Sequence, residues 1–188
     1  MFEETLARLA VALDARSIPY MVVGGQAVLL HGEPRLTRDI DVTVGLDLGG
    51  LDTLLEVVRD LSLKPIPEDV RSFVRETMVL PALDEASGVR VDFILSFTPY
   101  ERQAMDRVAR RVIRGCEVRF ASAEDLIVHK IFAGRARDLE DVRSILARNP
   151  DLDHAYIRRW LREFDASTGP VGAGTFLRTF EEVSAERG

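Results

Sequence analysis

Asp39 and Asp41, two aspartates separated by a single apolar residue, have the type and the spacing needed to bind a metal ion. Polar and apolar residues alternate from 39 to 45, which predicts a β-strand with both carboxylates on one face and the apolar side chains in a core. Carboxylates this close repel each other, so a cation between them would stabilise the strand. Mg²⁺ meets this need, because it prefers oxygen ligands and is commonly held by one or two carboxylates together with substrate phosphates.

Gly24 and Gly25 lie upstream of these acids, directly after the apolar, β-rich run 20–23. This pattern predicts a strand over 20–24, a sharp turn and a short apolar helix over 25–31. The N–H groups at the start of that helix would attract an anion such as a phosphate. An isolated Asp-x-Asp is more often a solvated turn or a strand edge, but the preceding glycine pair favours a combined metal and nucleotide site.

The spacing of these residues resembles a known signature. Gly24-Gly25, thirteen further residues and Asp39-Ile40-Asp41-Val42 are similar to the glycine and carboxylate pairs of nucleotidyltransferases with a polymerase-β-like catalytic core. The chain also resembles the AbiEii-type branch of that superfamily, which includes toxins of toxin–antitoxin pairs. The residues that carry this second resemblance are Gly24, Gly25, Gln26, Ala27, Val28, His31, Gly32, Arg35, Thr37, Asp39, Ile40 and Asp41.

The resemblance implies a third carboxylate on a neighbouring strand, and Asp92 is the candidate. It is the one acid in the otherwise apolar and basic segment 89–95, which has the period of a strand. In the family pattern Asp39 and Asp41 hold two Mg²⁺ ions at the triphosphate, while Asp92 binds metal and positions or deprotonates the attacking hydroxyl. The alternative is that Asp92 is a charge on an edge strand that discourages aggregation.

A second stretch, residues 125–142, resembles the motif in which a helical lysine and a later acidic residue complete the nucleotide site. The resemblance implies nucleotide-binding roles for Lys130 and Asp138, and less directly for Arg137. Arg38, immediately before the carboxylate pair, is a further candidate for nucleotide binding. The alternative is a solvent-exposed helix face with ion pairs three and four residues apart. Lys130 is one of only two lysines among 25 basic residues, and its compact ammonium suits a phosphate contact.

Composition indicates a globular protein with an acidic net charge. The net charge of −6 over 188 residues argues against a basic nucleic-acid-binding surface over the whole chain. Six arginines between 102 and 119 leave open either a local RNA-binding surface or a plain one. A single cysteine excludes an internal disulfide, and no apolar run is long enough to span a membrane. The acidic, amphipathic start lacks the features of a signal peptide, so we expect a cytoplasmic protein without a membrane partner.

These elements predict an α+β fold in which a small mixed sheet carries the three aspartates. We expect residues 1–121 to form a polymerase-β-like catalytic core, and residues 122–188 to form a helical region that packs on the core and completes the nucleotide site. The other predicted elements are a helix at the start, a helix over 51–61, an end of regular structure at Pro65 and Pro67, strands near 77–83 and 89–95 with a turn over 84–88, a helix over 99–107, short strands within 109–120, helices from the N-cap Ser122 onward, a linker over 165–172 and a last helix over 174–185.

The expected reaction is attack of an acceptor hydroxyl on the α-phosphate of a nucleoside triphosphate, with Mg²⁺ ions stabilising the attacking and leaving oxygens. The sequence leaves the acceptor open among a tRNA 3′ end, a protein and a small molecule, and it leaves open a toxin with an antitoxin partner. Three alternatives remain: an antibiotic-modifying nucleotidyltransferase, a catalytically idle nucleotide-binding or protein-interaction module, and a metal-dependent nuclease. The nuclease would leave the glycine turn without a role.

Overall fold

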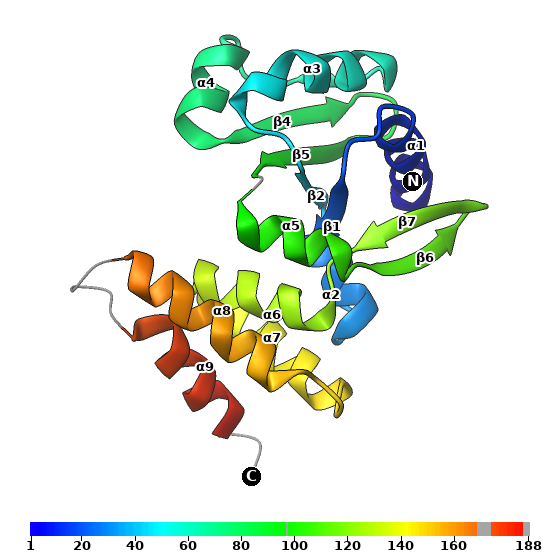
Figure 1. Cartoon of the computed structure of the whole chain (residues 1–188). Helices are drawn as coiled ribbons and strands as arrows, with labels where there is room; N and C mark the ends of the chain where they lie inside the picture. Colours follow the sequence, from blue (N-terminus) through cyan, green and yellow to red (C-terminus); the bar gives the residue numbers. More distant parts are fainter. Residues whose placement is uncertain (97, 169–173, 186–188) are drawn as a thin grey trace. The chain divides into compact units, whose positions relative to one another are not determined.

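A computed structural model describes residues 1–96, 98–168 and 174–185 (Figure 1). The chain forms two compact units, of which the first comprises Met1–Gln26 and Leu36–Ala121 and the second Ala27–Arg35 and Ser122–Gly188. The first unit contains a mixed sheet with helices, and the second is helical, so the predicted α+β fold is confirmed. None of the described helices is both long and apolar enough to cross a membrane.

The first unit is built on a seven-stranded sheet. The described strands follow the order β3-β4-β5-β2-β1-β7-β6 across it. Their bounds are β1 Tyr20–Val23, β2 Asp39–Val44, β3 Lys64–Pro65, β4 Val79–Asp84, β5 Val89–Leu95, β6 Ala109–Ile113 and β7 Cys116–Phe120. β2 runs antiparallel to β1 and parallel to β5, and β4 runs antiparallel to β5, which makes the sheet mixed.

Alternation along β2 and β5 separates a core face from a polar face. Ile40 and Val42 of β2 are no more than 1% exposed, and Val91 and Phe93 of β5 are fully buried. The acids occupy the intervening positions, because successive side chains of a strand point to opposite faces. The hydrophobic core therefore fixes the direction in which the carboxylates project, as the sequence period predicted.

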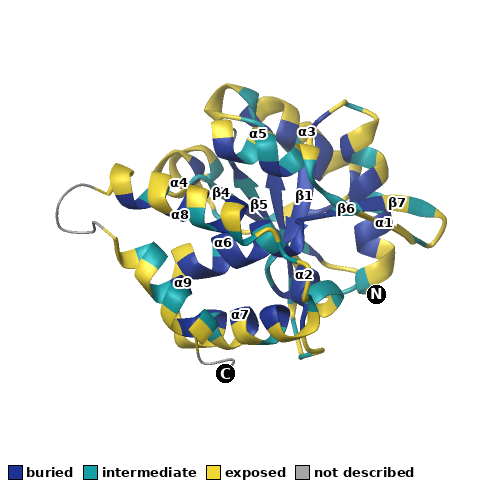
Figure 2. Ribbon diagram, turned by 60° about the horizontal axis from the view of Figure 1, so that its bottom comes forward, coloured by how far each residue is buried: buried dark blue, intermediate teal, exposed yellow. Residues whose placement is uncertain are grey.

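The described helices of the first unit carry both buried and exposed residues (Figure 2). They are α1 Phe2–Asp14, α3 Leu51–Asp60, α4 Val70–Thr77 and α5 Pro99–Asp106, with a 3-10 turn at Leu48–Gly50. Leu6, Leu9 and Leu13 recur at helical spacing on α1 and are at most 3% exposed. This buried side of α1 lies against β6 and β7 and beside α3.

In its described residues, the second unit consists mainly of four helices. They are α6 Ala123–Ala133, α7 Ala136–Arg148, α8 His154–Ser167 and α9 Thr175–Ala185. The Ser122 hydroxyl accepts a hydrogen bond of 3.0 Å from the Asp125 backbone N–H, so the predicted N-cap is confirmed. α6 contacts the other three helices and is buried over most of its length (Figure 2), which makes it the central helix of this unit.

The helix α2, Gly24–His31, begins in the first unit and enters the second at Ala27. Residues 27–35 contact α7. A Cβ on Gly32 would lie 2.5 Å from the Ser144 hydroxyl, so the backbone approaches α7 closely there. The Asn149 side chain donates a hydrogen bond of 2.8 Å to the His31 carbonyl.

Three sequence expectations were wrong. A helix, α4, occupies residues where the sequence predicted none, because Asp69 accepts from the Ser72 N–H and caps it. Pro65, expected to end regular structure, lies in the edge strand β3, where a missing N–H is tolerated. The linker predicted over 165–172 begins too early, since α8 continues to Ser167; residues 169–172 lie outside the described part of the chain.

Candidate functional site

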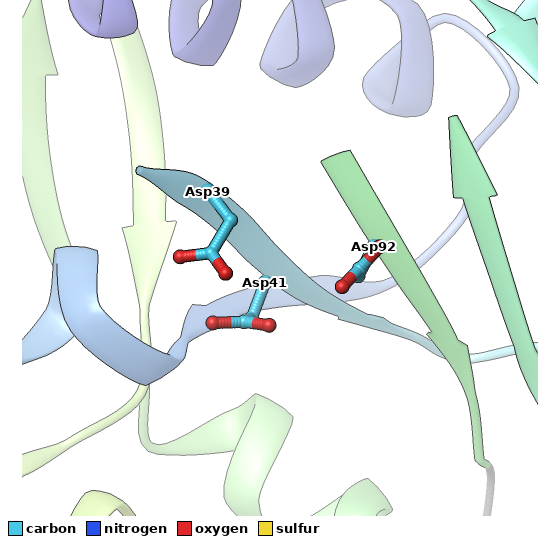
Figure 3. A group of neighbouring side chains, drawn as sticks. All are labelled: Asp39, Asp41 and Asp92. Atoms are coloured by element: carbon cyan, nitrogen blue, oxygen red, sulfur yellow. The ribbon is translucent and has the colours of Figure 1, made fainter. Parts of the chain in front are cut away.

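Three carboxylates meet on the polar face of the sheet (Figure 3). Asp39 and Asp41 project from β2 and Asp92 from β5, and one oxygen of each lies within 4.8 Å of the other two. Opposite ligand oxygens of a Mg²⁺ ion are roughly 4.2 Å apart, since Mg–O bonds are about 2.1 Å long. The donor set and its spacing therefore fit a divalent cation after small side-chain rotations.

The sheet register explains why the three acids meet. In the parallel pair β2–β5, Asp41 lies directly opposite Asp92. Residues opposite each other in a sheet share a face, so the two carboxylates point the same way. β5 has β2 on one side and β4 on the other, which rules out the alternative that Asp92 is an edge-strand charge.

Two polar neighbours hold the acids in place. The Thr37 hydroxyl donates to Asp39 Oδ1 at 3.1 Å. Arg90 Nε lies 2.7 Å from Asp92 Oδ1, and this hydrogen bond is the main cause of a raised pKa for Arg90, with smaller contributions from the charges of Asp92, Asp39 and Asp41. Arg90 thus offsets part of the negative charge. Sequence reasoning gave it no role, although period two already placed it on the Asp92 face.

The glycine turn lies next to one of the acids, Asp41. Gly24 has a φ of +60°, and a Cβ at this position would lie 1.9 Å from Asp41 Oδ2. Glycine suits both demands, because other residues rarely adopt this backbone and a Cβ here would force the Asp41 carboxylate to move. Gly25 is in the first turn of α2, where N–H groups lack partners within the helix.

Gln26, also in the first turn of α2, was missed as a site residue. It is 7% exposed, and its Nε2 is buried with no hydrogen-bond partner among the described residues. A buried amide donor without a partner is costly, so this one suits a ligand oxygen such as that of a phosphate. Its place directly after the glycine pair was the available signal. Arg38, predicted to bind nucleotide, is an exposed residue immediately before β2.

Lys130 and Asp138 lie in a buried ion-pair network of the second unit. Lys130 Nζ is 2.7 Å from Asp138 Oδ1 and 2.8 Å from Asp141 Oδ2. Arg35 makes two hydrogen bonds to Asp141, of 2.7 and 2.8 Å. The Lys130 side chain is only 7% exposed, so the alternative of a solvent-exposed face is wrong for this residue.

This network changes the titration of its acids. Burial would raise the pKa of Asp138, but hydrogen bonds from Arg135 and Lys130 outweigh burial and lower it. The pKa of Asp141 is lowered in the same way, since hydrogen bonds from Arg35 and Lys130 exceed the effect of burial. Both carboxylates are therefore held ionised. Sequence reasoning missed Asp141, because its spacing does not reveal which acid faces Lys130.

Comparison with known proteins gives a family and a fold. A family model described as "Nucleotidyltransferase of unknown function (DUF6036)" matches residues 2–164. No curated protein sequence matches the chain.

Solved structures resemble this chain in fold. An antigenic nucleotidyltransferase-like protein from Paracoccidioides brasiliensis has 18% identity and a TM-score of 0.57, covering 93% of this chain and 91% of that one. ANT(2")-Ia, solved in complex with adenylyl-2"-tobramycin, has 19% identity and a TM-score of 0.58, with 89% and 98% covered. The lincosamide antibiotic adenylyltransferase LnuA, solved with lincomycin, has 13% identity and a TM-score of 0.54, with 78% and 97% covered.

Proposed function

The chain belongs to the DUF6036 family of nucleotidyltransferases, and from this premise we propose that it transfers a nucleoside monophosphate from a nucleoside triphosphate to an acceptor hydroxyl. The observation that carries the proposal is the convergence of Asp39, Asp41 and Asp92 within 4.8 Å. Gly24 lies in contact with one of these acids at the start of a helix. A carboxylate cluster beside a helix N-terminus suits a metal and a phosphate together.

Each acid has a role in this proposal. Asp39 and Asp41 hold metal at the triphosphate, and Asp92 binds metal and orients the acceptor hydroxyl. When bound, two Mg²⁺ ions would supply charge stabilisation at the attacking and leaving oxygens. The acceptor oxygen attacks the α-phosphorus in line, and pyrophosphate leaves.

The remaining contacts are assigned to the nucleotide. The backbone at Gly24 and Gly25 and the Gln26 amide donate to phosphate oxygens, and Arg38 adds a positive charge. Nucleotide-binding roles for Lys130 and Asp138 rest on the family resemblance alone. Their side chains bond to each other at 2.7 Å, so a phosphate contact would require Lys130 to exchange a partner. The division into a catalytic core over 1–121 and a contributing helical region over 122–188 rests on the same resemblance.

A small-molecule acceptor is the preferred case among the acceptors. One structural neighbour is named an antibiotic adenylyltransferase and another an antibiotic-resistance factor, and the second was solved with adenylyl-2"-tobramycin. This supports an antibiotic-modifying or related small-molecule activity as the specific form of the proposal. A toxin role with an antitoxin partner rests only on the AbiEii-type resemblance of the sequence.

The test is transfer of label from α-labelled nucleoside triphosphates. The protein is incubated with Mg²⁺ and each nucleotide, together with separate pools of tRNA, protein and small molecules. Label should appear in one pool, disappear when EDTA removes the metal, and be almost absent with Asp41→Asn, which keeps the shape of the side chain but loses its charge.

Two results would contradict the proposal. Unchanged nucleotide binding by Asp41→Asn, with no label in any pool, would favour an idle nucleotide-binding module. Metal-dependent fragmentation of the tRNA pool without incorporated label would favour a nuclease.

A further inference from the structure

A groove of about 550 Å³ opens on the first unit where β3, β4, β5 and α4 meet. Its wall is partly apolar and partly acidic. Apolar and acidic residues that line it are Ile66, Phe73, Pro81, Glu68, Asp69 and Glu76. Ile66 and Phe73 are 50% and 38% exposed, although both are large apolar side chains. A groove of this size suits a small molecule.

The groove begins beside the third carboxylate. Arg90 lines it and at the same time bonds to Asp92 through Nε at 2.7 Å. Pro81, another lining residue, lies directly opposite Asp92 in the β4–β5 pair, and Asp41 lies opposite Asp92 on the other side. Pro81, Asp92 and Asp41 therefore share one row on one face of the sheet. A molecule in the groove would lie next to the acid that orients the attacking hydroxyl.

The charge of the groove disfavours the nucleotide as its ligand. Glu68, Asp69 and Glu76 contribute three carboxylates, and the single guanidinium, that of Arg90, is already bonded to Asp92. A triphosphate or a nucleic-acid backbone would meet repulsion there, whereas a cation would be attracted. Apolar Ile66 and Phe73 give a surface for a carbon skeleton. Charge and shape together favour a small, positively charged organic molecule.

We propose that this groove binds the acceptor, and that the acceptor is a small hydroxyl-bearing molecule with protonated amino groups. The inference rests on the proposed nucleotidyl transfer and names its acceptor class. The acceptor oxygen forms a bond to the α-phosphorus, and the bond from that phosphorus to the oxygen bridging to the β-phosphate breaks. Pyrophosphate leaves with the electron pair, and the hydroxyl proton passes to the Asp92 carboxylate and then to solvent.

The test uses a matched pair of probes, the β-1,4-linked trimer of glucosamine and its fully N-acetylated counterpart. Both carry hydroxyls, but only the first carries amino groups that can be protonated. Calorimetric titration without nucleotide should show binding of the amine form, weaker binding of the acetylated form, and loss of affinity with added salt. The double variant Glu68→Gln/Glu76→Gln should weaken the amine form about fivefold to tenfold, as expected for two exposed ion pairs.

A control separates local from general charge effects. Glu56→Gln removes one carboxylate from the exposed side of α3, outside the groove, and should leave probe binding unchanged. Phe73→Ala should weaken both probes, because it removes apolar surface rather than charge. The proposal is overturned if the amine trimer does not bind, if the acetylated trimer binds equally well, or if the double variant binds like the wild type.

Nucleotide binding distinguishes failure of this inference from failure of the proposed function. With Mg²⁺ and a non-hydrolysable nucleoside triphosphate, the double variant should bind nucleotide as the wild type does, whereas Asp41→Asn should not. Conversely, Asp41→Asn should keep its affinity for the amine trimer. If only the nucleotide-binding results differ from these expectations, nucleotidyl transfer is contradicted. If only the affinity of Asp41→Asn for the amine trimer is lost, the acceptor groove is contradicted. Transfer of label to tRNA in preference to the amine trimer would also overturn the acceptor class.

Discussion

Gly24 combines two constraints, and a substitution by alanine violates both of them. Its backbone is left-handed, and the place of a Cβ is taken by Asp41 Oδ2 at 1.9 Å. Gly24→Ala should therefore displace the Asp41 carboxylate as well as strain the backbone. We expect a loss of stability of about 1–3 kcal/mol and at least a tenfold weaker Mg²⁺-dependent nucleotide binding. Chemical denaturation and calorimetric titration measure the two effects.

Gly88 provides the matched control for this substitution. It has a φ of +71°, but nothing lies within 4 Å of the place where its Cβ would stand. Gly88→Ala should cost a similar amount of stability and leave nucleotide binding unchanged. Equal nucleotide binding by both variants would mean that the contact of Gly24 with Asp41 has no part in the site.

At the scale of residues, much of the candidate site could be predicted. The direction of Asp39, Asp41 and Asp92 follows from period two, since the apolar neighbours must face the core. The partners of a side chain do not follow from a period. Arg90 and Asp141 were missed for this reason, because a sequence does not state which charges come within hydrogen-bond distance.

At the scale of elements, Lys130 of α6 forms ion pairs with two acids of α7, and the stability that these pairs contribute should depend on pH. The pKa values of Asp138 and Asp141 are lowered in the folded state, so their contribution to stability is present above the unfolded pKa of about 4. It is lost as pH falls through the lowered folded values. Asp138→Asn should be about 1–3 kcal/mol less stable at pH 7 and lose less stability than the wild type on acidification.

Unfolding can be followed by the fluorescence of Trp160, the only tryptophan of the chain, because α8 belongs to the same unit as these ion pairs. The control is Asp52→Asn, which removes the acid of an exposed ion pair with Arg71. That change should lower the free energy of unfolding by less than about 1 kcal/mol and leave its pH dependence almost unchanged. An identical acid response of wild type and Asp138→Asn would show that the buried pairs do not stabilise the fold.

Elements differ in how well the sequence predicted them. β5 was predicted at its observed bounds, because a strand buried on one face needs strict alternation. α4 was missed: Val74 is its only buried residue, so almost no apolar period marks it, and the cap at Asp69 decides its start. The short edge strand β3 depends on pairing with β4, which no local pattern encodes.

At the scale of the whole molecule, ligand binding should appear as thermal stabilisation. Three carboxylates within 4.8 Å repel one another without a cation, so Mg²⁺ and nucleotide together should stabilise more than either alone. At a ligand concentration of about 100 times the dissociation constant, the free energy of unfolding should rise by roughly 2.7 kcal/mol and the melting temperature by on the order of 5–10 °C. Scanning calorimetry with a non-hydrolysable nucleotide measures it. Equal shifts in wild type and Asp39→Asn/Asp41→Asn would place the nucleotide elsewhere.

The path of the chain between the two units has a consequence for synthesis. Residues 27–35 belong to the second unit, yet residues 36–121 intervene before the rest of that unit begins. During translation the segment with Gly32 and Arg35 emerges well before Ser144 and Asp141, its contacts on α7. At about 5–20 residues per second it waits on the order of 10 s for them. Residues 27–35 connect the glycine turn to the segment that carries the carboxylate pair. If a ribosome stalls before residue 122, this connection therefore lacks α7, the helix that it contacts in the complete chain.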